Sequence, residues 1–278
     1  MERNLNLLKE VLSVPTVTYK EEKMVQYLTD WLQKNNIEYY TDVHNNVYAT
    51  KKVTEELPEN FYFPLVISHT DTVHNLDSIN VVEEQLPDAQ DNIKLSLKAY
   101  NDKCHPTGIG GDDKCGVFAC LTLLAEMPYL KAAFFVSEET GCHGSRKSDP
   151  KFFENVGYGI QFDAPENWMI TEFCFGTRLF TRNSEFFQKC DRVLNESFEK
   201  KEYMRHPYTD VQALKEKYDF QCINFSIGYY NYHTKEEYVV VDDVFNGIDA
   251  GKKMIESLGY TKYKLINKPS QSQFRFDF

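Results

Sequence analysis

Four short apolar runs, at residues 65–68, 133–136, 158–162 and 222–225, are the feature that most limits what this chain can fold into. None of them alternates strictly between apolar and polar residues, so each is typical of a strand buried on both faces. Helical patterns separate the runs, which is the arrangement of parallel strands joined by crossover helices. The sequence therefore predicts an α/β fold with a mostly parallel central sheet and helices on both faces.

Apolar residues at helical spacing predict helices over residues 4–13, 21–34, 114–127, 185–200 and 244–258. Shorter strand-like pieces occur at 37–41 and 46–50. The 278 residues contain no internal repeat, and we expect one domain over residues 1–265. Within it, residues 75–104 are expected to form a peripheral insertion, a hairpin. Residues 266–278 are polar and are expected to form a loose tail.

Composition narrows the range of partners. The formal net charge is −11 and Lys and Arg are not clustered, so no nucleic acid partner is expected. No apolar run approaches the roughly 18 residues of a membrane span, and the first residues lack the apolar core of a signal peptide.

Seven cysteines without a C-x-x-C pair indicate reduced thiols in a cytoplasmic protein, with no cysteine-ligated zinc.

Acidic and imidazole residues cluster where the predicted buried strands end. Three of the four runs lead directly into such residues, and the fourth leads to one within a few positions. The residues concerned, including an aspartate that opens a predicted helix, are His69, Asp71, Asp112, Glu138, Glu139, Asp163 and His233. Each alone has an ordinary structural explanation as a turn, cap or surface residue. Because ligands bind beyond the carboxyl ends of parallel strands, their joint position predicts a metal site.

The residue types suit zinc. Imidazole nitrogen and carboxylate oxygen are zinc ligands, and a catalytic site leaves one position open for water. Two imidazoles and three carboxylates can hold two ions if one carboxylate bridges them, and ions about 3.5–4 Å apart polarise a carbonyl and activate water. A further carboxylate beside the ions could act as general base. Asp71 lies two residues after His69, where it could orient the imidazole ring.

Five stretches, at residues 68–73, 108–116, 136–141, 162–164 and 231–238, resemble the co-catalytic di-zinc exopeptidases. This clan includes peptidase T, the carnosinases and lidless aminopeptidases. Residues 13–17, which precede Glu21, also fit the opening helix pair of the family. The resemblance covers roughly residues 1–260.

The resemblance implies a role for each site residue. Asp112 would bridge two divalent metal ions, with zinc expected first and cobalt or manganese as alternatives. His69 and Asp163 would complete one ion, and Glu139 and His233 the other. Glu138 would be the general base and Asp71 would orient His69. The peptide bond between Asp112 and Asp113 is also expected to be cis.

One departure from the family stands out. Peptidase T and the carnosinases insert a lid or dimerisation domain between the ligands that match Asp163 and His233. Only 70 residues separate these two positions here. We therefore expect a lidless, single metallopeptidase catalytic domain, present as a monomer or weak homo-oligomer.

Three functions remain open. The first is hydrolysis at the end of short peptides, by an aminopeptidase or a di- or tripeptidase, since an Asp at position 163 resembles those enzymes. The second is an amidohydrolase acting on small N-acyl amino acids, which a cationic pocket for a carboxylate would favour; Arg178, Arg182 and Arg205 are the candidates for such a pocket. The third is a metal-binding protein without catalysis, although Glu138, whose loss would be expected in that case, is present.

Overall fold

The computed structural model describes residues 4–87, 91–206 and 208–266, and it is built around a nine-stranded sheet. The strands run in the order β1-β2-β7-β3-β8-β12-β9-β10, and β11 pairs with β9. Their bounds are β1 (Glu38–Thr41), β2 (Val47–Lys52), β3 (Phe63–His69), β7 (Tyr129–Phe135), β8 (Val156–Ala164), β9 (Met169–Cys174), β10 (Thr177–Arg178), β11 (Glu202–His206) and β12 (Gln221–Ser226).

The four predicted apolar runs form the centre of this sheet as β7, β3, β8 and β12. These strands are parallel to one another, whereas β1, β2, β9 and β10 join the sheet by antiparallel pairs. Every residue of β3, β8 and β12 is buried. Burial on both faces explains why these strands read as continuous apolar runs, and the predicted fold class is confirmed.

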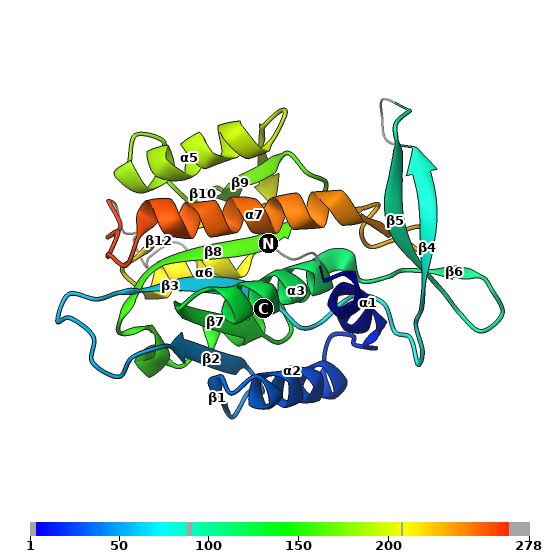
Figure 1. Cartoon of the computed structure of the whole chain (residues 1–278), viewed down its shortest axis with the longest axis horizontal. Helices are drawn as coiled ribbons and strands as arrows, with labels where there is room; N and C mark the ends of the chain where they lie inside the picture. Colours follow the sequence, from blue (N-terminus) through cyan, green and yellow to red (C-terminus); the bar gives the residue numbers. More distant parts are fainter. Residues whose placement is uncertain (1–3, 88–90, 207, 267–278) are drawn as a thin grey trace, which may run out of the picture.

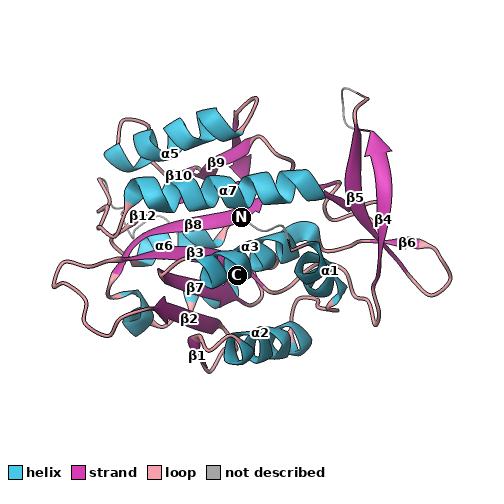
Figure 2. Ribbon diagram, viewed as in Figure 1, coloured by secondary structure: helices cyan, strands magenta, loops and turns pink. Residues whose placement is uncertain are grey.

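Helices cover both faces of the sheet (Figure 1, Figure 2). Helices α3 and α7 lie over one face, with α1 and α5 packed beside them, and α4 and α6 lie over the other. The bounds are α1 (Leu5–Ser13), α2 (Glu22–Lys34), α3 (Gly111–Glu126), α4 (His143–Arg146), α5 (Glu185–Ser197), α6 (Asp210–Lys217) and α7 (Val241–Leu258), with a 3-10 turn η1 (Pro150–Phe153).

All five predicted helices are present; the four-residue α4 was not predicted, and neither was α6. Residues 210–215 of this short helix are all buried, so the helix has no polar stripe opposite an apolar one. Three of these buried residues, Asp210, Gln212 and Lys215, are polar, so the sequence shows no apolar stripe at helical spacing. Helix α3 is also buried over residues 111–124, but it is rich in apolar residues and was predicted, with its start placed at residue 114.

A second, smaller sheet projects from one end of the molecule. It contains β4 (Asn80–Pro87), β5 (Ile93–Tyr100), β6 (Pro106–Thr107), β13 (Tyr229–Tyr230) and β14 (Tyr238–Val240), in the order β13-β14-β5-β4 with β6 on β5. Strands β4 and β5 are antiparallel and project beyond the rest of the chain (Figure 1). They are more than the expected peripheral hairpin, because β5 also pairs with β14.

Most of the expected C-terminal tail, residues 267–278, lies outside the described residues. Among the helices of the described ranges, none combines the length and the apolar character needed to span a bilayer.

Candidate metal centre

The seven residues predicted to form the site lie together at the carboxyl ends of the central strands. His69 is the last residue of β3, and Asp163 lies next to the end of β8. Glu138 and Glu139 follow β7 in a turn, Asp112 lies at the start of α3, and His233 lies in the loop between β13 and β14. Parallel neighbours deliver these side chains to one edge of the sheet, as the sequence pattern indicated.

Asp112 occupies the middle of the site. Its Oδ1 lies 3.1 Å from His69 Nε2, and its Oδ2 lies 3.2 Å from His233 Nε2. The two oxygens of one carboxylate thus face two different imidazoles. The peptide bond from Asp112 to Asp113 is cis, as the resemblance implied.

Each imidazole has a further carboxylate of its own. His69 Nε2 lies 3.6 Å from Asp163 Oδ1, and His233 Nε2 lies 3.1 Å from Glu139 Oε2. The side chain of His69 is only 1% exposed, whereas that of His233 is 42% exposed. One half of the site is therefore enclosed, and the other half opens to solvent beside His233.

Glu138 and Glu139 differ in surroundings although they are adjacent in the chain. Glu138 Oε2 lies 4.0 Å from His69 Nε2, while Glu139 contacts His233. Glu138 Oε1 also accepts a weak hydrogen bond from Cys142 Sγ at 3.5 Å. Both side chains are largely buried, at 5% and 8% exposure.

Asp71 connects the end of β3 to the turn that carries Glu138 and Glu139. Its Oδ1 lies 3.3 Å from His69 Nδ1 and accepts a hydrogen bond from Glu138 N at 3.0 Å. Its Oδ2 accepts from Glu139 N at 3.3 Å and from Thr18 Oγ1 at 2.8 Å. One buried carboxylate therefore orients both an imidazole and the backbone that carries the two glutamates.

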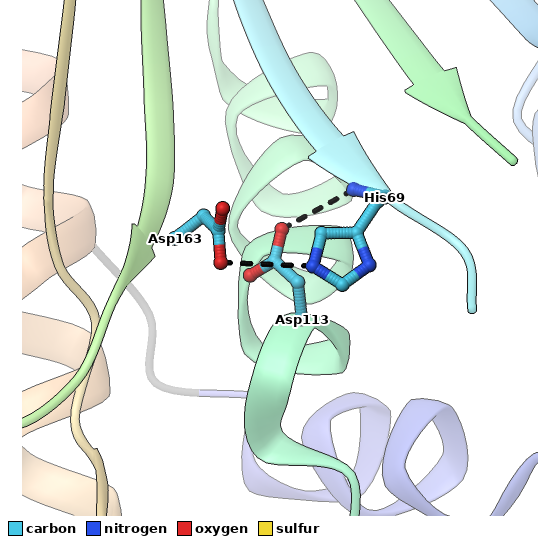
Figure 3. Close-up of side chains that lie close together, drawn as sticks. All are labelled: His69, Asp113 and Asp163. Atoms are coloured by element: carbon cyan, nitrogen blue, oxygen red, sulfur yellow. Dashed lines mark hydrogen bonds and ion pairs between the residues drawn. The ribbon is translucent and has the colours of Figure 1, made fainter. Parts of the chain in front are cut away.

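Asp113 is a buried carboxylate that the sequence analysis did not assign to the site. Figure 3 shows its side chain beside those of His69 and Asp163. Its Oδ2 accepts from His69 N at 3.3 Å and its Oδ1 from Gly116 N at 3.1 Å. These bonds to backbone amides fix the start of α3 against the end of β3. In the sequence, the only sign of Asp113 was its position next to Asp112. The structure separates the two residues: Asp112 faces the imidazoles, and Asp113 bonds to backbone amides.

Burial and mutual repulsion disturb the ionisation of these groups. Burial raises the pKa of Asp163 to about 8, against an opposing hydrogen bond from His69. Burial likewise raises the pKa of Glu138 well above its usual range, and the charges of Asp163 and Asp210 add to this effect. Burial opposes a charge on His69, but its carboxylate partners outweigh that penalty and raise its pKa well above the usual value. His233 is raised to a pKa of about 10 by its hydrogen bonds to Asp112 and Glu139.

This donor set fits divalent cations. Six carboxylates, Asp71, Asp112, Asp113, Glu138, Glu139 and Asp163, gather around two imidazoles in a largely buried space. The raised pKa values mean that protons are drawn in to offset the excess negative charge. Divalent cations offset the same charge by displacing such protons, and their binding is accordingly coupled to pH. Two overlapping groups of residues could hold a metal ion. One is His69 with Asp113 and Asp163, and the other is His69 with Asp112 and Glu139. In each group the possible ligand atoms lie within 4.8 Å of one another.

Two buried carboxylates near the site were also missed. Asp210, at the start of α6, is linked to Asp163 through Gln161, whose Nε2 donates to Asp163 Oδ2 at 3.1 Å and to Asp210 Oδ2 at 3.4 Å. No pattern in the sequence indicated Asp210, since α6 itself was not predicted. Glu237 lies within the stretch 231–238, but the resemblance gave it no role.

The three arginines considered for a cationic pocket have other partners. Arg182 makes two hydrogen bonds to Glu172, at 3.0 and 2.6 Å, and Arg178 Nε lies 3.6 Å from the same carboxylate. Arg178 and Arg205 both lie over the ring of Phe173, each 5.0 Å from its centroid.

The sequence matches no protein-family model and no curated protein, but the fold matches solved structures. The chain superposes on an aminopeptidase PepT from Bacillus cereus with a TM-score of 0.73 and 14% identity, over 92% of this chain and 98% of that one. A tripeptidase from Staphylococcus aureus gives a TM-score of 0.68 and 13% identity over 92% and 97%. The Pyrococcus horikoshii TET1 peptidase, which can assemble into a tetrahedron or an octahedral shell, gives 0.63 and 13% over 92% and 99%. The chain thus shares its fold with these peptidases, and this is the fold that the resemblance implied.

Asn224 provides a test of how the site is supported. Its Oδ1 accepts from Asp163 N at 2.8 Å and its Nδ2 donates to Asp163 O at 2.7 Å, where the register between β8 and β12 shifts. Asn224→Ala should lower the free energy of unfolding by roughly 2–4 kcal/mol, since each buried group left unpaired costs about 1–3 kcal/mol. Urea denaturation measures the change.

The matched control is Asn195→Ala, on the exposed side of α5. It should change stability by less than about 0.5 kcal/mol. Equal stability losses in the two variants would contradict the supporting role of Asn224.

Proposed function

We propose that this protein is a di-metal exopeptidase that releases residues from the N-terminal end of short peptides. The observation that carries the proposal is the position of Asp112, whose two oxygens face the imidazoles of His69 and His233. A bridging carboxylate between two sites, each with one imidazole and one further carboxylate, is the arrangement that a pair of zinc ions requires.

In this proposal Asp112 would hold both ions, His69 and Asp163 would complete one site, and His233 and Glu139 would complete the other. When bound, the two cations polarise the carbonyl of the scissile bond and lower the pKa of water. Asp71 holds the His69 ring through Nδ1, which would leave Nε2 free to bind a metal ion. Zinc is the proposed metal, with cobalt and manganese as the alternatives that supply would decide.

Glu138 is proposed as the general base. Its carboxylate lies further from His69 Nε2 than that of Asp112 or Asp163, at 4.0 Å against 3.1 and 3.6 Å. It can therefore accept a proton from the attacking water and return it to the leaving amine without being a ligand. Asp71 fixes its backbone through the hydrogen bond from Glu138 N.

Two observations favour a peptidase over a deacylase. The solved structures that share the fold include an aminopeptidase and a tripeptidase. In addition, Arg178 and Arg182 are paired with Glu172, which offsets the charge that a substrate carboxylate would require. The deacylase remains the second candidate because its chemistry, the addition of water to an amide carbonyl, is the same. A non-catalytic metal-binding role is the third.

The proposed substrate is a short peptide. A fold shared with a shell-forming peptidase is compatible with large assemblies, and a monomer or weak homo-oligomer stays a prediction for this chain.

Metal content tests the proposal directly. Purified protein saturated with zinc and then freed of excess metal should contain two ions per chain by elemental analysis. Chelation should lower the melting temperature and zinc should restore it, because a ligand present at 100 times its Kd stabilises the folded state by about 2.7 kcal/mol. A protein that retains no divalent metal would contradict the proposed function.

Glu138→Gln tests the general base. Gln keeps the shape of the side chain but cannot accept the proton, so kcat should fall by about 10²–10⁴-fold or more while zinc content stays near that of the wild type. Glu139→Gln is the matched comparison and should instead lower zinc occupancy, because Glu139 contacts His233. Loss of a metal in Glu138→Gln, with full occupancy in Glu139→Gln, would reverse the two roles.

Three versions of one tripeptide test which end is recognised. We expect the free and the C-amidated peptides to lose their N-terminal residue and the N-acetylated peptide to resist, because an aminopeptidase needs the free amine. Chromatography of the released amino acids measures this. Preferred cleavage of the acetylated peptide would instead support the deacylase.

A further inference from the structure

Glu237 lies where three loops of the proposed metal site meet. The first is the loop after β3, which begins after His69 and contains Asp71. The second leads into Asp112, and the third, between β13 and β14, carries His233. We propose that Glu237 is a positioning residue that holds the loops of Asp112 and His233 at the spacing a pair of metal ions requires. The inference rests on the proposed function, since it concerns the same metal site.

The contacts with the Asp112 loop are made through backbone amides. Glu237 Oε1 accepts from Asp112 N at 3.1 Å, and Glu237 Oε2 accepts from Gly110 N at 2.8 Å. Both oxygens of one carboxylate therefore bind the backbone at and just before the proposed bridging ligand. The amides at the start of a helix have no partners within the helix, so an anion here is favourable.

The contact with the loop after β3 is made through His74. Its Nε2 lies 2.8 Å from Glu237 Oε2. The ring packs so tightly against residue 108 that a Cβ placed on Gly108 would lie 1.9 Å from His74 Cε1. The glycine therefore permits the close approach that brings His74 to the carboxylate.

The link to His233 is along the chain. Glu237 is the last residue before β14, and its own N–H donates to Thr234 O at 3.3 Å, which closes the turn after His233. Strand β14 is fixed on both sides, by β13 and by β5. A shift of the Glu237 carboxylate would therefore move the Asp112 amide relative to the base of the His233 loop.

The Glu237 side chain is 0% exposed, and a buried carboxylate is costly unless it is fully paired. Its three side-chain hydrogen-bond donors are His74, in the loop that follows the proposed ligand His69, and Gly110 and Asp112, at the proposed bridging ligand and just before it. A cap that only stabilised α3 would need no bond to His74 and no place beside His233. The outer partners of metal ligands typically affect metal affinity by 10–100-fold, which sets the expected size of the effect.

The test compares Glu237→Gln with Glu236→Gln, its exposed neighbour. Glu236 is 61% exposed and lies 3.8 Å from Lys98, so its amide variant controls for the loss of one negative charge in the same loop. In Glu237→Gln the side chain keeps one acceptor oxygen. An NH2 group replaces the other oxygen and faces a donor with which it cannot form a hydrogen bond. Zn²⁺ is titrated into metal-free protein by calorimetry, and the absorption spectrum of the Co²⁺-loaded protein is recorded.

We expect about 10–100-fold weaker binding of at least one Zn²⁺ and an altered Co²⁺ spectrum in Glu237→Gln, with both unchanged in Glu236→Gln. A fall in stability with wild-type affinity and spectrum would mean that Glu237 only caps α3, and would overturn the inference. If Glu237→Gln does not fold, His74→Phe decides, because it keeps a ring over Gly108 and removes the donor. That variant should also weaken binding, to a smaller extent, and unchanged affinity would overturn the inference.

The two hypotheses fail differently. Wild-type protein that binds no divalent metal contradicts the proposed function and, with it, the role of Glu237. Wild-type protein that binds two ions while Glu237→Gln binds them equally well contradicts the role of Glu237 alone.

Discussion

The structure depends on the cost of burying several carboxylates at one edge of a parallel sheet. Asp112, Asp113, Glu138 and Asp163 are each 6% exposed or less, and they lie around an imidazole that is 1% exposed. Like charges in such a space repel one another, and burial penalises each charge separately. Protons or cations must offset this excess. The raised pKa values of Asp163 and Glu138 and the affinity for divalent metal proposed here have the same physical origin.

The rest of the fold limits how these carboxylates can move. Asp163 is held by the Asn224 side chain and Gln161, Glu138 by Asp71, and Asp112 by Glu237. Each support comes from a different part of the chain, and most act through a backbone N–H of the supported residue. In the proposed metal site, ligands held in this way would have little freedom to relax without a metal, so the geometry would be largely prepared before binding. Preparation of this kind favours catalysis, which loses rate when groups are misplaced by about 1 Å.

The fold shows a similarity to known peptidases that comparison of the sequence does not detect. Superposition covers more than nine-tenths of both chains for the PepT aminopeptidase at only 14% identity, while no family model matches. A packed α/β core tolerates extensive exchange of apolar residues if volume and pattern are kept. Residues that must ligate a metal tolerate far less change, because their donor atoms and positions are both specified. As proposed metal ligands, the strand-end residues therefore say more about function than the percentage identity of the whole chain does.

The sequence by itself determined the central strands, the five long helices and the residue types of the proposed site. Strands buried on both faces leave continuous apolar runs, and the rule that ligands collect at their carboxyl ends led to His69, Asp163 and the two glutamates. The tertiary structure alone showed α6, because its buried residues include the polar Asp210, Gln212 and Lys215 and leave no apolar period to detect. It joined the predicted hairpin to β14. It also revealed that Asp113 bonds to backbone amides and that Glu237 links three loops. These roles depend on contacts between residues as much as 163 positions apart, such as His74 and Glu237, and no local pattern records such a contact.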